Sequence, residues 1–382
     1  MGDYYLQSVL CLYEINNGNH VFIRLFTMVA AVCSIVSCTS ESQKIVEEYR
    51  QSPPFPDIVS ISGKVLPLDL IGPSQILNVG DYLVVCMFSD AEAMIHIFDS
   101  SDYDLLAKVF SKGRGPNEAP AMGLVFQKDC TPGESAIWVM GMPMFFGKLN
   151  IKKSIDEQKP VFDEMFNFST HKANSQLLLQ SNIVYYHNDN KLWMLMDPER
   201  SGNWAENVNP FYISYDFAQG VASLNKTYVS TFAKPEHRDD YNMLRFIAGE
   251  STRSDFKKSV IAYRIMDRFN IIDFDSKKIL VIGTDGVPPK KINPLYVKEK
   301  YKGLCTTDQR IILLGMDKSV NKGKSYFDIF DWDGNPVVRI LVNEEVMTPD
   351  ISCKGLIYCI CSEEENADGT DKIIRYDFSP YL

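Results

Sequence analysis

The sequence is short of the residues and motifs that mark several common classes of protein. Lys and Arg total 39 against 49 Asp and Glu, so the net charge of −10 leaves no basic surplus to neutralise phosphates. With five His in all, it has neither an HExxH nor a GxSxG motif. Nine Cys in 382 residues are too few for a disulfide scaffold. The sequence therefore predicts no nucleic-acid partner and carries no recognisable hydrolase signature.

Long apolar runs are also scarce, and the run near the N-terminus is too short to span a bilayer. Leu25–Ser37 is uncharged, follows Arg24 and has the size of the apolar core of a signal peptide. It leads into Cys38 through Ile-Val-Ser, which resembles the bacterial lipobox, where the Cys is acylated and becomes the new N-terminus. Residues 1–37 are thus predicted to be a lipoprotein signal peptide, with Cys38 as a lipid anchor to the membrane. The alternative is a buried strand or helix.

The segments around the lipobox refine this prediction. Asp3 and Glu14 stand where such leaders carry basic residues, which indicates a translation start near Val21. Polar and proline-rich residues follow the anchor, so 38–57 is expected to be a flexible tether ahead of a globular domain at 58–382. The Thr after the lipid Cys, where some bacteria place an Asp for inner-membrane retention, favours the outer membrane, facing the periplasm or the surface.

The body of the chain repeats one pattern six times. In each copy a strand-like run ends in an acidic or amide residue, turn residues follow, and in five copies a second strand-like run comes next. A further run rich in Val, Ile, Tyr and Trp precedes each copy, which satisfies the criteria for strands. We therefore predict an all-β fold, a six-bladed β-propeller of four-stranded blades. The marker residues at the strand ends are Asp99, Asn150, Asp216, Asp275, Asp331 and Asp377.

Two features of these repeats have structural explanations. An Asp at a strand end bonds its own backbone two residues on, so the markers are expected to set turns, and Asp333-Gly334 is a hairpin signal that lacks the further ligands of a calcium loop. Cys359 and Cys361 share one face of a strand without suitable His partners, which favours packing. The sequence predicts no metal and no cofactor.

The sixth copy is incomplete because the chain ends shortly after its marker. An N-terminal segment, Ile58–Leu70, is strand-like and has no partner nearby in the sequence. Pairing it with the C-terminal blade closes the ring and removes an open edge. We expect a closed propeller that is monomeric.

One loop resembles a known family. Phe110–Glu118, FSKGRGPNE, is similar to the G-[KR]-G-P-x-E segment that follows the first blade in the TolB-like six-bladed propeller lipoproteins of Bacteroidetes. With the leader and the hairpins, the resemblance covers most of the chain. Asn117 stands where the family often has Gly, and Ala119 where an aromatic is frequent. The resemblance implies a fold and an envelope location, and no reaction.

The candidate site residues come from loops. The glycines and proline of the 110–118 loop suit a crossover between blades, and Arg114, Asn117 and Glu118 could also bind a carboxylate or sugar hydroxyls. Trp204 lies in a polar insertion, and Pro235–Ser259 is a second insertion with a helical character.

Two functions fit these features. The first is a non-enzymatic binding or scaffolding module of the cell envelope, for a protein, a peptide or a glycan. The alternative is a glycan-active hydrolase or lyase with its site at the central channel, where distant blades converge. Paired carboxylates in a pocket would favour the enzyme.

Overall fold

The computed structural model describes the chain from residue 46 onward, with gaps. The described ranges are 46–90, 92–115, 118–125, 127–131, 134–141, 145–168, 181–188, 191–196, 211–219, 221–228, 247–264, 268–283, 301–317, 324–365 and 370–382. Cys38, Asn117 and Trp204 lie outside these ranges. Within them, no helix is long and apolar enough to cross a membrane.

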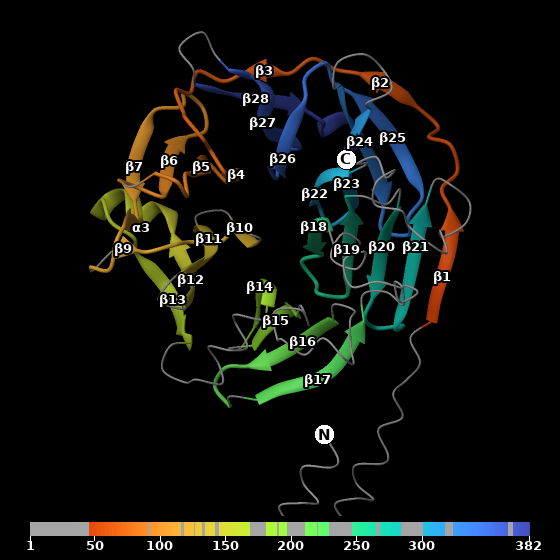
Figure 1. Cartoon of the computed structure of the whole chain (residues 1–382), viewed down its shortest axis with the longest axis horizontal. Coiled ribbons are helices and arrows are strands. Elements are labelled where there is room, and N and C mark those ends of the chain that lie inside the picture. Colours follow the sequence, from red (N-terminus) through yellow and green to blue (C-terminus); the bar gives the residue numbers. More distant parts are fainter. Residues whose placement is uncertain are drawn as a thin grey trace, which may run out of the picture. The chain divides into compact units, whose positions relative to one another are not determined.

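Six antiparallel sheets form a ring, which confirms the six-bladed propeller (Figure 1). From the centre outward, blade 1 contains β4 (Gln75–Val79), β5 (Tyr82–Cys86), β6 (Ile95–Asp99) and β7 (Leu105–Val109), and blade 2 contains β10 (Gln127–Thr131), β11 (Glu134–Gly141), β12 (Phe145–Asn150) and β13 (Phe162–Asn167). Blade 3 contains β14 (Ser181–Asn188), β15 (Lys191–Met196), β16 (Phe211–Asp216) and β17 (Val221–Tyr228).

The remaining blades include N-terminal strands. Blade 4 contains β18 (Ile247–Thr252), β19 (Lys258–Tyr263), β20 (Arg268–Asp273), β21 (Lys278–Gly283) and the outer β1 (Val46–Gln51). Blade 5 contains β22 (Tyr301–Thr306), β23 (Arg310–Asp317), β24 (Lys324–Asp331), β25 (Pro336–Leu341) and β2 (Ile58–Ser60), and blade 6 contains β26 (Val346–Ile351), β27 (Leu356–Glu365), β28 (Asp371–Asp377) and β3 (Lys64–Val65). Minor elements are β8 (Ser111–Lys112), β9 (Glu118–Ala119), helix α3 (Ile151–Glu157) and the 3-10 turn η4 (Ser379–Tyr381).

Five of the six marker residues set turns or caps as expected. The side chains of Asp99, Asp216, Asp331 and Asp377 accept backbone N–H bonds from residues two to four positions ahead, and Asn150 caps α3 by accepting from Lys153. In blade 4 the prediction that Asp275 ends the strand and sets the turn was wrong. There β20 ends two residues earlier, and the carboxylate of Asp273 accepts from Ser276 N at 2.8 Å. Gly334, with φ +76°, occupies the hairpin turn after β24.

The N-terminal segment closes the ring, as predicted. β3 pairs antiparallel with β28, and Leu66 N donates to Ile373 O at 2.8 Å. Before this point the segment follows the outer edges of blades 4 and 5, where β1 and β2 pair in parallel with β21 and β25. The sequence predicts a flexible tether at 38–57. The structure differs from this prediction from Val46 onward, because β1 is paired with β21 along its whole length.

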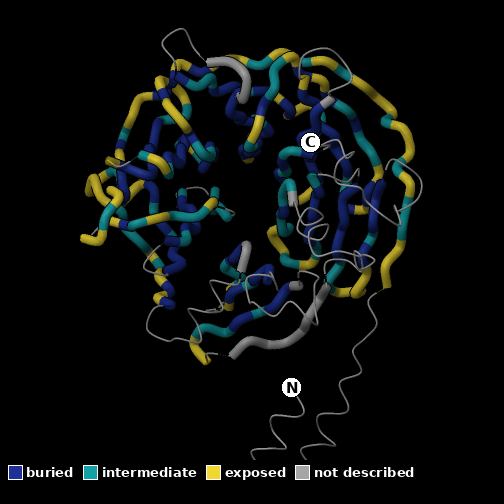
Figure 2. Tube along the Cα trace, in the orientation of Figure 1, coloured by how far each residue is buried: buried dark blue, intermediate teal, exposed yellow. Residues whose placement is uncertain are grey.

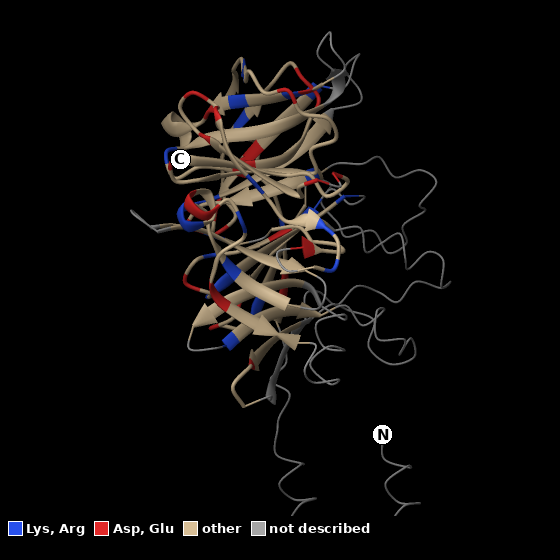
Figure 3. Cartoon of the chain, turned by 90° about the vertical axis from the view of Figure 1, so that its left-hand side faces the viewer, with Lys and Arg blue, Asp and Glu red and all other residues tan. Residues whose placement is uncertain are grey.

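Apolar side chains are buried between blades rather than at the centre. Six core clusters of described residues each join two neighbouring blades, and together they account for every junction of the ring. The second and third strands of the blades are mostly buried, whereas the exposed residues lie on the outer segments and turns (Figure 2). Acidic and basic residues are interspersed over the blades (Figure 3). Cys359 and Cys361 are buried in the cluster between blades 5 and 6, in agreement with a packing role.

Candidate functional site

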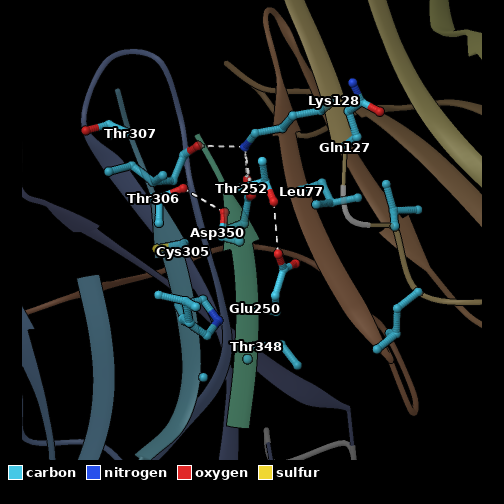
Figure 4. A pocket seen from close by; sticks show the side chains of 18 of the residues that line it. Leu77, Gln127, Lys128, Glu250, Thr252, Cys305, Thr306, Thr307, Thr348 and Asp350 are labelled. Atoms are coloured by element: carbon cyan, nitrogen blue, oxygen red, sulfur yellow. Dashed lines mark hydrogen bonds and ion pairs between the residues drawn. The ribbon is translucent and has the colours of Figure 1, made fainter. Parts of the chain in front are cut away.

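A cavity of about 420 Å³ lies at the centre of the ring. The innermost strands β4, β10, β14, β18, β22 and β26, one from each blade, all contribute residues to its lining. Figure 4 shows part of this lining, with Lys128 and Asp350 pointing toward one another. This volume falls within the range of small-molecule sites. The central cavity is therefore the candidate functional site of the propeller.

Polar contacts join every pair of neighbouring blades around this cavity, through residues on the innermost strands or in the segments that lead into them. Gln75 and Gln127 each bond both the N–H and the C=O of a residue in the next blade. The other junctions are bridged by Tyr185–Glu250, Ser251–Thr306, Lys302–Glu345 and the Asn78 N–H to Asp350. These contacts satisfy polar groups that would be costly to bury alone, and they fix the shape of the cavity wall.

Glu250 is a buried carboxyl group in this wall. Its side chain accepts hydrogen bonds from the hydroxyls of Tyr185 at 2.6 Å, Tyr212 at 2.7 Å and Thr252 at 2.9 Å. The residue is 6% exposed, and burial raises its pKa to about 7 although the three hydroxyl donors act in the opposite direction. At neutral pH Glu250 can therefore hold or release a proton.

Asp350 is the second buried carboxyl group, and it is paired. Lys128 Nζ lies 2.5 Å and 2.7 Å from its two oxygens and also donates to Ile351 O at 2.6 Å. Burial raises the pKa of Asp350, and the Lys128 charge opposes this rise. Lys128 belongs to blade 2 and Asp350 to blade 6, so the pair spans blade 1 at the side where the ring closes.

Lys128→Met is expected to lower the free energy of unfolding by about 2 kcal/mol, because it leaves a largely buried carboxylate without its cation. Urea denaturation at pH 7 measures this loss. The double variant Lys128→Met/Asp350→Asn should recover much of it, and Lys112→Met, at an exposed position, should change stability by less than about 0.5 kcal/mol. A single variant as stable as the wild type would show that the pair contributes nothing.

The cavity has two chemically different walls. Blades 4, 5 and 6 contribute a row of side-chain hydroxyls: Ser251, Thr252, Ser254, Thr306, Thr307 and Thr348. Blade 1 and the segment that leads from it into blade 2 contribute Leu77, Leu124 and Val125. A ligand in this cavity would meet mainly hydroxyl groups on one side, and on the other side apolar side chains next to Gln75, Gln127 and Lys128.

Two residues of the lining have a left-handed backbone that side chains with a Cβ rarely adopt. Thr348, φ +47°, lies in a bulge of β26, and Phe256, φ +57°, lies in the turn between β18 and β19. Phe256 packs edge-on against His187 with ring centroids 4.5 Å apart. Such conformations cost about 1–3 kcal/mol each and cluster at functional sites.

The loop residues predicted from sequence lie away from this cavity. Arg114 is exposed and does not line it, and Glu118 accepts a hydrogen bond from Gly115 N at 2.6 Å. Glu118 therefore stabilises its own loop, which supports the structural explanation of the G-R-G-P-N-E segment. The same crossover does reach the cavity a few residues later, at Leu124 and Val125.

Sequence reasoning missed the residues that do form the site. Glu250 was assigned to the helical insertion at Pro235–Ser259, but the described part of that segment forms β18 and the start of β19. Lys128 and Asp350 lie on innermost strands that no apolar run revealed. Among the described residues, no group of three or more His, Cys, Asp or Glu side chains could hold a metal ion.

No protein-family model and no curated protein matches the sequence. Among solved structures, a Bacteroides fragilis protein described as exported is similar with 10% identity and a TM-score of 0.49, covering 87% of this chain and 99% of that one. A member of the DUF4221 family from Bacteroides vulgatus has 11% identity and a TM-score of 0.49, covering 82% and 97%. The PQQ-bound aldose sugar dehydrogenase of Streptomyces coelicolor has 11% identity and a TM-score of 0.45, covering 82% and 97%. The strand pairing of this chain defines the propeller independently of these likenesses.

Proposed function

We propose that this protein is a lipid-anchored protein of the cell envelope whose propeller is a non-enzymatic binding module, with its ligand site in the central cavity. The lipobox-like sequence ending at Cys38 supports the anchor. The observation that supports binding is that the charged groups of the wall already have partners: Lys128 bonds Asp350, Lys302 bonds Glu345 and Arg253 bonds Asp255. A wall of satisfied groups holds a fixed shape, which suits recognition.

The state of the two carboxyl groups argues further for binding over catalysis. A glycosidase of the common type needs two carboxyl groups free to act on the sugar from either side. Here Asp350 is held by Lys128 and by the Asn78 N–H, and Glu250 is held by three hydroxyls. Neither of these buried groups faces the cavity without internal partners. The third carboxylate of the lining, Asp308, is exposed and accepts from Ser254 Oγ at 2.5 Å.

An array of immobilised glycans and peptides tests this proposal with a matched pair of variants. Leu124 lines the cavity and is 46% exposed, so Leu124→Trp should obstruct the site without breaking a polar contact of the wall. Met165, 52% exposed on β13, does not line the cavity and provides Met165→Trp as the control. We expect the wild type and the control to bind the same probe and Leu124→Trp to lose at least tenfold in affinity. Equal binding by all three proteins, or binding to no probe, would overturn the proposal.

A second candidate is a glycan-active hydrolase or lyase, and the pKa of Glu250 favours it. A carboxyl group that titrates near pH 7 is poised for general acid chemistry. Mass spectrometry of array probes incubated with the wild type and with Glu250→Gln separates the two functions. Cleavage that disappears in Glu250→Gln would establish the enzyme, and intact probes with both proteins support the binding module.

A further inference from the structure

We infer that the ligand of the central cavity is a neutral glycan, and that the Thr348 hydroxyl is one of its direct contacts. This inference rests on the proposed function and adds the chemical class of the ligand. It is drawn from the charge, the hydroxyl content and the backbone strain of the cavity wall.

The pairing of the cations argues against an anionic ligand. Recognition of a carboxylate, sulfate or phosphate uses a cation whose hydrogen-bond donors face the ligand. The described lining contains three cations, Lys128, Lys302 and Arg253, and each lies in an ion pair with a carboxylate of the chain. An anionic ligand would have to break one of these pairs, whereas a neutral ligand leaves all of them intact. The exposed carboxylate of the lining, Asp308, accepts from Ser254 Oγ at 2.5 Å.

The two walls of the cavity fit the two kinds of surface on a sugar. Pyranose rings carry hydroxyl groups around their edge and C–H groups on their faces. The hydroxyls of blades 4, 5 and 6 can both donate and accept, so those engaged in one contact, such as the Ser251–Thr306 bond at 2.7 Å, keep capacity for another. Across the cavity, Leu124, which is 46% exposed, provides apolar surface for a ring face, and Leu77 and Val125 belong to the buried core beside the cavity.

Thr348 is the residue whose conformation points most clearly to a ligand. Its Oγ1 is buried and has no hydrogen-bond partner among the described residues, and a buried hydroxyl without a partner costs about 1–3 kcal/mol. Its backbone is in the left-handed region, which is unfavourable for a β-branched residue. The bulge that holds it fits closely against β22, because a Cβ on Gly303 would lie 2.6 Å from Pro349 Cδ. A ligand hydroxyl that bonds Thr348 would remove the cost of the unpaired hydroxyl, and it requires the side chain to turn its buried Oγ1 toward the cavity.

Calorimetric titration of the full-length protein with small probes tests this inference. The probes are three neutral disaccharides (maltose, cellobiose and diacetylchitobiose), acidic digalacturonate and the dipeptide dialanine. We expect at least one neutral disaccharide to bind and digalacturonate to bind at least tenfold more weakly. Thr348→Val, which keeps the shape and the strained backbone but removes the hydroxyl, should weaken disaccharide binding about tenfold. Thr348→Ser, which keeps the hydroxyl, should bind within about twofold of the wild type.

The outcomes separate this inference from the proposed function. Digalacturonate or dialanine binding that Leu124→Trp abolishes would keep the cavity as a binding site and overturn the neutral glycan. Unchanged disaccharide binding by Thr348→Val would overturn the assigned contact. If no titration probe and no array probe binds, both proposals fail.

Discussion

The triple variant Leu66→Ala/Leu68→Ala/Leu70→Ala is expected to be unfolded at room temperature. These leucines alternate along the closing segment, are each less than 5% exposed, and pack in one cluster with residues of blades 1 and 6. A buried Leu→Ala change costs about 2–5 kcal/mol, so three together cost about 6–15 kcal/mol, comparable with the 5–15 kcal/mol that stabilises most folded domains. Far-UV circular dichroism and thermal denaturation measure the loss.

The N-terminal strands β1, β2 and β3 provide a control for this variant. Val46, Ile58 and Val65 are 55%, 62% and 47% exposed, so their triple replacement by Ala removes as many large apolar side chains from the N-terminal strands without opening the core. This control is expected to lose less than about 1.5 kcal/mol in total. If the two triple variants melt alike, the segment does not close the ring through its buried leucines.

Loss of the proton from Glu250 is expected to make the propeller less stable as the pH rises from about 4.5 to about 7. Its ordinary pKa of 4.5 describes the unfolded chain, and burial raises the folded value to about 7. Between these values the folded protein binds the proton more tightly, so its stabilising effect is complete below pH 4.5 and is lost as the pH passes 7. At about 1.4 kcal/mol per pKa unit, the loss is about 3 kcal/mol.

Glu250→Gln isolates this effect from all other titrations. Glutamine keeps the size of the side chain and an oxygen that accepts from Tyr185 or Tyr212, but it cannot ionise. Urea denaturation at pH 5 and pH 7.5 should therefore show that the variant gains about 2.4 kcal/mol relative to the wild type, because this interval covers most of the titration but not all of it. A difference that does not change with pH would show that Glu250 titrates near its ordinary pKa.

The sequence was sufficient for the outer parts of each blade. The second and third strands carry apolar runs because they are buried between neighbouring blades, and turn residues such as Asp99, Asp331 and Asp377 mark the ends of the third strands. The closing segment was also predictable, since the sixth hairpin lacked a partner strand. The parallel pairing of β1 with β21 was not, because its sequence VEEYRQ has little apolar pattern and its pairing comes from a distant blade.

The site escaped prediction because it lies on the innermost strands. Sequences such as QKDCT, IAGEST and VMTPDI are polar or contain Gly and Pro, as suits strands that face a central cavity rather than the core, so they do not read as strands. The site is built from residues of three blades: Lys128, Glu250 and Asp350. They are separated by up to 222 residues, and only the closed ring brings them to one cavity. The G-R-G-P-N-E loop could be recognised from the sequence because its motif residues are contiguous in the chain.

A crystal structure of the protein with the array probe of highest affinity tests most directly whether the central cavity is the binding site. We predict electron density for the probe between the hydroxyls of Thr306 and Thr348 and the apolar side chains of Leu77 and Leu124. Density for the probe at the loop around Arg114, or elsewhere on the rim, with the central cavity free of it, would contradict this prediction.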